Sequence, residues 1–324
     1  ALGETPTLID EELNQLKVAV LPLQDGEFYH YGTSREMISS TMAIQNLVYD
    51  QRSIMHLGVK AHPSIFTQNC CHEIKFSSTN KNTWIENSWV PSTWSLTHEN
   101  IITGVPVNEW HISLEPGICV DIVPLEEDKW VVRPYGFNDA MRGDLRDAST
   151  EYLGRPVTEW LAERGLNADE IDGNTDLQNS RIFPVCNTME EMERLLHWMI
   201  DEPKSEDANA WRAAQRLSAN EISDQANLRR LQQQRLAFRK ENLIALALNH
   251  RCSIFYQTNL DDLAHEFHNL EVPVPEALPE SEPLLKRIND HMFRSRLLEM
   301  NGKDGSAEGA RAFSLLAEGL TEDV

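Results

Sequence analysis

A short polar run between an aromatic segment and a helix-forming segment is the first place in this sequence where chemistry could occur. Residues 28–34 read Phe-Tyr-His-Tyr-Gly-Thr-Ser, and the residues that follow carry apolar side chains at helical spacing. Gly32, Thr33 and Ser34 would place backbone N–H groups and hydroxyls at a helix N-terminus, where the helix dipole stabilises an anion such as a phosphate. The same three residues could also form a plain helix cap with a tight turn.

A second polar cluster combines arginine with aspartate. Residues 133–136 read Arg-Pro-Tyr-Gly, and residues 142–147 read Arg-Gly-Asp-Leu-Arg-Asp. Because the arginine side chain presents a rigid fork of donors, such a cluster can bind an anion or pair its charges internally. Internal pairing is the favoured interpretation.

Several familiar catalytic motifs are missing from the sequence. It contains neither G-x-G-x-x-G nor G-x-x-x-x-G-K-[ST], the two common phosphate-binding loops. None of its His-Glu pairs continues into H-E-x-x-H, which excludes that class of zinc site. Cys70, Cys71 and His72 are adjacent, but neighbouring residues on a strand point to opposite faces. No metal site is therefore predicted.

Composition limits the class of protein. Lys and Arg number 29 against 51 Asp and Glu, which gives a net charge of −22. Such a balance repels phosphate backbones and anionic lipid, so we expect no nucleic-acid or membrane partner. Five cysteines without a C-x-x-C motif indicate reduced thiols in a cytoplasmic protein. No apolar run is long enough to span a bilayer.

The elements around the first polar run can be predicted from local pattern. Residues 17–23 and 27–31 are apolar runs on either side of Asp25-Gly26, which predicts a β-hairpin. Residues 35–51 predict a helix with Thr33 or Ser34 as its N-cap.

Between residues 53 and 137 the signals are those of strands. Apolar residues recur every six positions from Trp84 through Val90 and Leu96 to Ile102, with turn-forming residues between them. A period of six is typical of a parallel β-helix in which each side of a coil turns one apolar side chain inward. Ordinary antiparallel strands are the alternative, since six is also a multiple of two.

Beyond residue 137 the pattern is helical. Thr188 and Ser218 each begin a capping box, and the second opens a helix predicted to run from 218 to 248. The other predicted helices cover residues 158–164, 261–270, 283–300 and 307–320. Residues 271–283 hold four prolines and four glutamates and predict a stiff linker.

Five segments carry a resemblance to a known family, the bacterial bifunctional fucokinase/GDP-fucose pyrophosphorylases of the Bacteroides type. These segments are GEFYHYGTS at 26–34, YDQR at 49–52, IITGVP at 101–106, RPYG at 133–136 and GDLRD at 143–147. The similarity extends over essentially the whole chain.

The resemblance implies an enzyme that phosphorylates L-fucose with ATP and then joins fucose 1-phosphate to GTP, forming GDP-fucose. The second reaction would need Mg²⁺ and cationic groups to hold the developing charge. Because neither nucleotide loop of the family is present, the chain would be an interior piece, inactive alone, that serves as scaffold and assembly surface. Its partners would be the missing nucleotidyltransferase and kinase domains of the same polypeptide and further copies of itself.

The implied fold class is α+β in three parts. Residues 1–52 would be a strand–helix remnant of a nucleotidyltransferase sheet, residues 53–137 a short single-stranded parallel β-helix, and residues 138–324 an all-α linker region leading to a kinase domain. No bound cofactor is expected in these parts.

The resemblance also suggests site residues. Related sugar-nucleotide transferases carry a strand of the form aromatic-x-Asp-x-Gly-Thr whose Asp binds the metal, and His30 stands in its place here. This departure argues against a metal and suggests that the run faces the sugar phosphate. The candidates for sugar-phosphate binding are His30, Tyr31, Gly32, Thr33 and Arg133, with no complete catalytic set.

Two other functions fit the sequence less well. A free-standing β-helix acyl- or nucleotidyltransferase would need a site between coils and a base such as His98 or His111. A module without enzymatic activity would need a stable complex with an unrelated protein.

Overall fold

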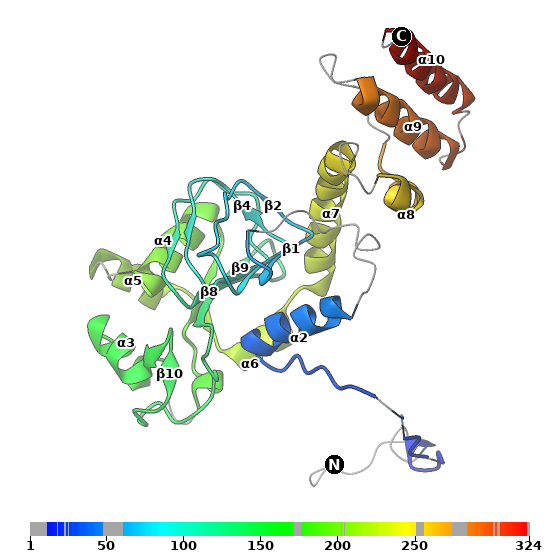
Figure 1. The fold of residues 1–324 in the computed structure, drawn as a ribbon. Coiled ribbons are helices and arrows are strands. Elements are labelled where there is room, and N and C mark those ends of the chain that lie inside the picture. The colour runs from blue at the N-terminus through cyan, green and yellow to red at the C-terminus, as the bar shows by residue number, and fades with distance from the viewer. Residues whose placement is uncertain are drawn as a thin grey trace. The chain divides into compact units, whose positions relative to one another are not determined.

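The structure is a computed structural model (Figure 1) that describes residues 12–17, 19–22, 24, 26–47, 61–171, 176–201, 203, 205–250, 256–273, 284–300, 302 and 305–322. The chain divides into two units, Ala1–His30 and Tyr31–Val324. No helix in these described ranges is both long and apolar enough to cross a membrane.

The described residues of the first unit do not form the predicted hairpin. Residues 27–30 and the described part of 17–23 have no strand structure, and Val20 and Leu21 are 90% and 86% exposed. A two-stranded hairpin is marginal in water unless an apolar face is covered, which accounts for the failure of this prediction.

The second unit begins with helix α2 (Ser34–Asn46). Its N-cap is Thr33, one of the two residues that the sequence predicts for this position, and the Thr33 hydroxyl oxygen accepts a hydrogen bond from the Glu36 N–H at 3.2 Å. Residues 48–51, the predicted end of this helix, lie outside the described residues.

Three sets of parallel strands form a solenoid of about three turns. One side contains β1 (Ile65–Gln68), β3 (Thr83–Glu86), β6 (Ile101–Thr103) and β8 (Ile118–Pro124). The other sides pair β2 (Cys71–His72) with β4 (Trp89–Val90), and β5 (Ser95–Leu96) with β7 (Ser113–Leu114). The first coil places Ile65 beside Thr83, 18 residues later, as three six-residue sides require. The parallel pairing excludes the antiparallel alternative for these strands.

One coil is shorter than the others, and this changes the position of a predicted core residue. Trp84 pairs with Ile101, 17 residues later, so Ile85 rather than Trp84 is the neighbour of Ile102. Ile85 and Ile102 belong to the main core. Trp84 instead packs with Phe66 on the opposite face of the sheet. The prediction that Trp84 points inward is therefore wrong by one residue.

The sheet continues past the solenoid with antiparallel strands. Strand β8 pairs with β9 (Trp130–Gly136), which pairs with β12 (Phe183–Cys186), and β12 pairs with β13 (Arg216–Leu217). A small hairpin joins β10 (Glu151–Tyr152) to β11 (Arg155–Pro156). The region predicted to be all-α thus also contains strands, because the last coil offers an edge that later segments pair with.

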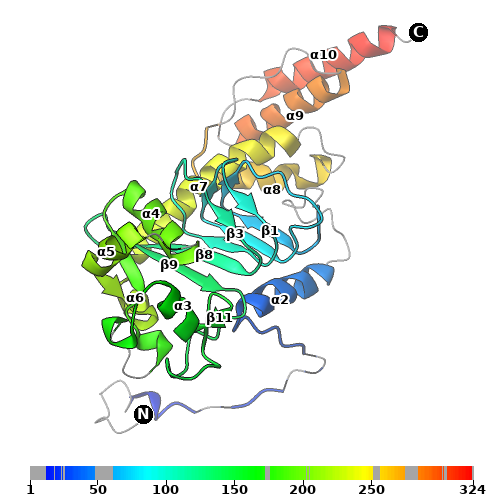
Figure 2. The same cartoon turned by 90° about the vertical axis from the view of Figure 1, so that its left-hand side faces the viewer.

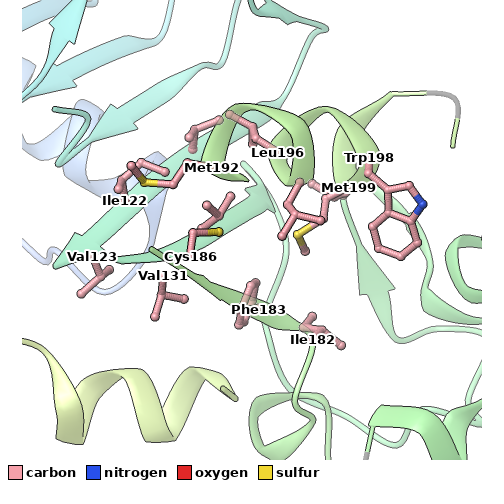
Figure 3. Packing of buried hydrophobic residues seen from close by; sticks show 14 of the residues in the cluster. Ile122, Val123, Val131, Ile182, Phe183, Cys186, Met192, Leu196, Trp198 and Met199 are labelled. Carbon is pink, nitrogen blue, oxygen red and sulfur yellow. The ribbon is translucent and has the colours of Figure 1, made fainter. Parts of the chain in front are cut away.

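Helices cover these added strands. They are α3 (Val157–Glu163), α4 (Met189–Ile200) and α5 (Ser205–Ala213), and α4 begins at the predicted N-cap Thr188. Figure 3 shows Met192, Leu196 and Met199 of α4 packed near Phe183 and Cys186 of β12. One core runs without interruption from the solenoid into this region. The three domain boundaries given above stay a prediction.

The helix predicted over residues 218–248 is two helices. The capping box at Ser218 opens α6 (Ala219–Gln225), and α7 (Leu228–His250) follows after a break. The break occurs where the Asn227 N–H donates to the Pro124 carbonyl at 2.8 Å. Further along α7, the Gln234 side-chain amide donates to the carbonyls of Asn87 and Gly104 at 2.8 and 2.9 Å. Helix α7 is thereby fixed to the solenoid corners.

The remaining helices are α8 (Tyr256–Asn269), α9 (Leu284–Met300) and α10 (Ser306–Glu322). Their positions agree with the sequence patterns. Most of the predicted linker, residues 274–283, lies outside the described residues.

Candidate functional site

The start of α2 and the end of β9 border one cleft of about 780 Å³ within the second unit. Figure 2 shows α2 beside the sheet that contains β8 and β9. The cleft is lined by residues 32–36 of the first polar run and the helix, by Arg133, Tyr135 and residues 137–142, and by Ala219 of α6. Parts of the two polar clusters singled out in the sequence thus meet at one place, although about 100 residues separate them.

Apolar packing holds α2 at the cleft. Ile38 is buried against Trp84, Ile101 and Cys119 on the outer face of the sheet. We call this set, with Phe66 and Phe137, the outer cluster. Polar contacts then fix the start of the helix, because Arg35 Nη2 donates to Asn138 Oδ1 at 2.5 Å.

Arg133 is the most firmly held cation of the cleft. It forms an ion pair with Asp121, whose other oxygen accepts a hydrogen bond from the Thr103 hydroxyl at 2.8 Å. Burial has the largest single effect and lowers the pKa of Arg133, but attraction to Asp121, Tyr135 and Tyr152 and the hydrogen bond to Asp121 together raise that pKa. The guanidinium therefore stays charged. Its Nε atom is buried and has no hydrogen-bond partner among the described residues.

Asp139 lines the cleft but is committed to the backbone. Its carboxylate accepts hydrogen bonds from the N–H groups of Gly136, Leu153 and Gly154 at 2.6, 2.7 and 3.1 Å. A side chain at Gly136 would collide with this carboxylate. Asp139 therefore shapes the loop after β9, and its oxygens have little capacity for a ligand.

The favoured pairing of charges within residues 133–136 and 142–147 is not seen among the described residues, since Arg133 pairs with Asp121 outside the cluster. Asp144 accepts the Arg146 N–H at 2.8 Å and Asp147 accepts the Ser149 N–H at 2.9 Å. The exposed Arg142 makes no ion pair with any residue in the described ranges. Short Asp side chains bond to nearby backbone in turns more readily than they reach arginines. Arg142 is thus free to meet a ligand in the cleft.

Only some of the predicted site residues line the cleft. Gly32, Thr33 and Arg133 line the cleft. Tyr31 does not, and its hydroxyl lies 3.3 Å from Thr41 Oγ1. His30 ends the first unit, where its ring stacks on Phe28 with centroids 5.9 Å apart. The sequence interpretation missed Arg35, which lines the cleft two residues after the N-cap and could have been found from that position.

The cleft combines three arginines, Arg35, Arg133 and Arg142, with the N-terminus of a 13-residue helix. Its two carboxylates already accept hydrogen bonds, Asp139 from the backbone and Glu36 from the Thr33 hydroxyl at 3.1 Å. Arginine forks and helix-terminal N–H groups both bind phosphate oxygens well. The arrangement is therefore suited to an anion.

The cleft does not fit a divalent metal. Among the residues that the structure describes, no group of three His, Cys, Asp or Glu side chains is placed to hold one. Asp121 is paired with Arg133, and Asp139 is occupied by backbone N–H groups. No step of the chemistry is therefore assigned to a metal here. Neither His98 nor His111 lines the cleft.

Comparison with known proteins now gives the family. The sequence model of the fucose pyrophosphorylase domain matches residues 6–188, more than half of the chain, and this range contains the solenoid and β9. The chain belongs to the fucose pyrophosphorylase domain family. This confirms the resemblance stated above.

A relative from Bacteroides fragilis, named L-fucokinase/L-fucose-1-P guanylyltransferase, is 47% identical over 326 residues. The match covers 100% of this chain and 34% of the relative. The chain thus spans about a third of the length of this relative.

Proposed function

We propose that this chain works as part of a fucose-salvage enzyme that phosphorylates L-fucose with ATP and forms GDP-fucose from fucose 1-phosphate and GTP. The family match and the name of the Bacteroides fragilis relative support both reactions. In this proposal the nucleotidyltransferase and kinase domains belong to the same polypeptide and work in the cytoplasm.

Within that enzyme, the cleft binds the phosphate of fucose 1-phosphate. The observation that carries this proposal is the gathering of three arginines at the start of α2, in a chain whose net charge is −22. Arg133 would contribute a firmly oriented guanidinium, while Arg142 and the first N–H groups of α2 would complete the phosphate site. The rest of the chain serves as scaffold.

This role fits the chemistry of guanylyl transfer. A phosphate oxygen of the sugar phosphate must attack the α-phosphorus of GTP while pyrophosphate leaves. Holding the attacking phosphate in one orientation lowers the entropic part of the barrier. Cationic groups also keep two highly charged reactants together. The resemblance implies that the whole enzyme also uses Mg²⁺, but no described residue of this chain is assigned to hold it.

The test is isothermal titration calorimetry of the 324-residue chain with fucose 1-phosphate. We expect Arg133→Gln to weaken binding by at least about tenfold, the cost of a lost hydrogen bond to a charged group. Arg146→Gln is the matched control, because Arg146 is exposed and does not line the cleft. Equal losses in the two variants, or no binding by the unmodified chain, would contradict the proposal.

Self-association is a further part of the proposal. β-Helices often associate through their flat sides, and the first unit exposes Val20, Leu21 and Phe28 by 86–90%. Exposed apolar groups of this kind favour association. Sedimentation at micromolar concentration should give a mass above the 37.0 kDa of one chain, and a purely monomeric mass would refute this part.

A further inference from the structure

Three neighbouring strands place a polar row behind the cleft. Thr103 of β6 is the parallel neighbour of Asp121 of β8, and Asp121 lies directly opposite Arg133 of β9. Directly paired residues on adjacent strands share one face of the sheet and contact each other. The row therefore leads from the solenoid to the cleft through side chains fixed by strand register.

The contacts within this row fix the guanidinium from one side. One Asp121 oxygen accepts the Thr103 hydroxyl at 2.8 Å and the other oxygen pairs with Arg133 Nη2. The Asp121 side chain is 12% exposed, whereas the Arg133 side chain is 31% exposed and lines the cleft. Because both carboxylate oxygens are engaged, Asp121 cannot turn toward a ligand. Its effect on a ligand must pass through Arg133.

We infer that Asp121 and Thr103 are positioning residues, which orient the Arg133 guanidinium toward a phosphate in the cleft. The Asp121 carboxylate sets the direction of the Arg133 guanidinium. The Thr103 hydroxyl holds that carboxylate, so that it does not rotate together with the guanidinium. This inference rests on the proposed function, because it deepens the role of the same cleft. Neither residue touches the ligand, so neither is catalytic.

The test must separate the effect of the Asp121 charge on phosphate binding from its effect on the orientation of Arg133. Asp121 also places a negative charge near the cleft, so a variant that removes this charge would strengthen phosphate binding by electrostatics alone. Thr103→Val keeps the shape and the charge and removes only the hydroxyl. Asp121→Glu keeps the charge and lengthens the arm by one methylene group, which displaces the guanidinium.

The experiment is titration of fucose 1-phosphate into the 324-residue chain and its variants. We expect Thr103→Val and Asp121→Glu each to weaken binding by about tenfold, which lies within the range of coupling measured between contacting residues. In the Arg133→Gln background, Thr103→Val should change the affinity by less than about twofold, because the residue that it orients is gone. Thermal unfolding of each variant shows that the chain is folded.

Thr97→Val is the matched control. It removes a solenoid hydroxyl that donates to the Leu114 carbonyl at 2.9 Å. Among the described residues, no hydrogen bond joins Thr97 to Asp121 or Arg133. Its affinity should equal that of the unmodified chain.

The outcomes separate this inference from the proposed function. If Arg133→Gln weakens binding but Thr103→Val and Asp121→Glu do not, the positioning role is wrong and the phosphate site stands. An equal effect of Thr103→Val with and without Arg133 also overturns the positioning role. If the unmodified chain does not bind fucose 1-phosphate, the proposed function fails and this inference fails with it.

Discussion

Gly104 occupies a corner of the solenoid that has no room for a side chain. It occupies a corner with φ of +69°, and a side chain there would collide with the carbonyl oxygen of Ile122. The corresponding corner of the previous coil has Asn87 with φ of +50°. Asparagine tolerates the left-handed region, but only glycine also allows the close approach of β8. The same corner receives α7, through Gln234.

We therefore predict that Gly104→Ala lowers the free energy of unfolding by about 2–4 kcal/mol, from backbone strain and a displaced strand. Gly154→Ala is the control, because Gly154 has φ of +70° but nothing lies within 4 Å of an added side chain. That variant should lose only about 1–2 kcal/mol, the cost of the left-handed backbone. Denaturant unfolding measures both, and equal losses would show that the close approach to Ile122 is unimportant.

Residue types alone could not predict the partner of Arg133. Asp121 belongs to a stretch of apolar strand residues and forms no motif with Arg133. Only the register of the β8–β9 hairpin brings the two together. The N-cap at Thr33, in contrast, was predictable, because a helix cap depends on a few consecutive residues.

At the scale of elements, the length of the repeat could be predicted from the sequence. Which residue of each strand faces inward could not. The period of six correctly indicates coils of three sides, since most paired residues are 18 apart. One coil of 17 residues moves Trp84 to the outer cluster, where it supports α2. In a coil that is one residue shorter, the side chains that would face inward face outward instead. Local composition does not reveal this change.

Later elements depend on long-range pairing. Strands β12 and β13 contain only four and two residues; β12 forms on the edge that β9 offers, and β13 forms on the edge of β12. Short strands of this kind have no periodic signal of their own. Likewise, the division between α6 and α7 occurs where Asn227 contacts the β8 end, although the helical pattern continues through it.

At the scale of the whole molecule, the cleft contrasts with the surrounding charge. The chain carries an excess of 22 negative charges, yet three arginines gather beside one helix N-terminus. An anionic ligand must overcome the repulsion of the rest of the surface, so its binding should depend on specific contacts rather than on general attraction. In the function proposed above, this ligand is a sugar phosphate.

The most direct test of this account is a crystal structure of the chain with fucose 1-phosphate. The account predicts that the phosphate lies in the cleft, with its oxygens about 2.7–3.0 Å from the guanidinium of Arg133 and close to the first turn of α2. A phosphate bound elsewhere on the chain, with the cleft filled only by water, would contradict it.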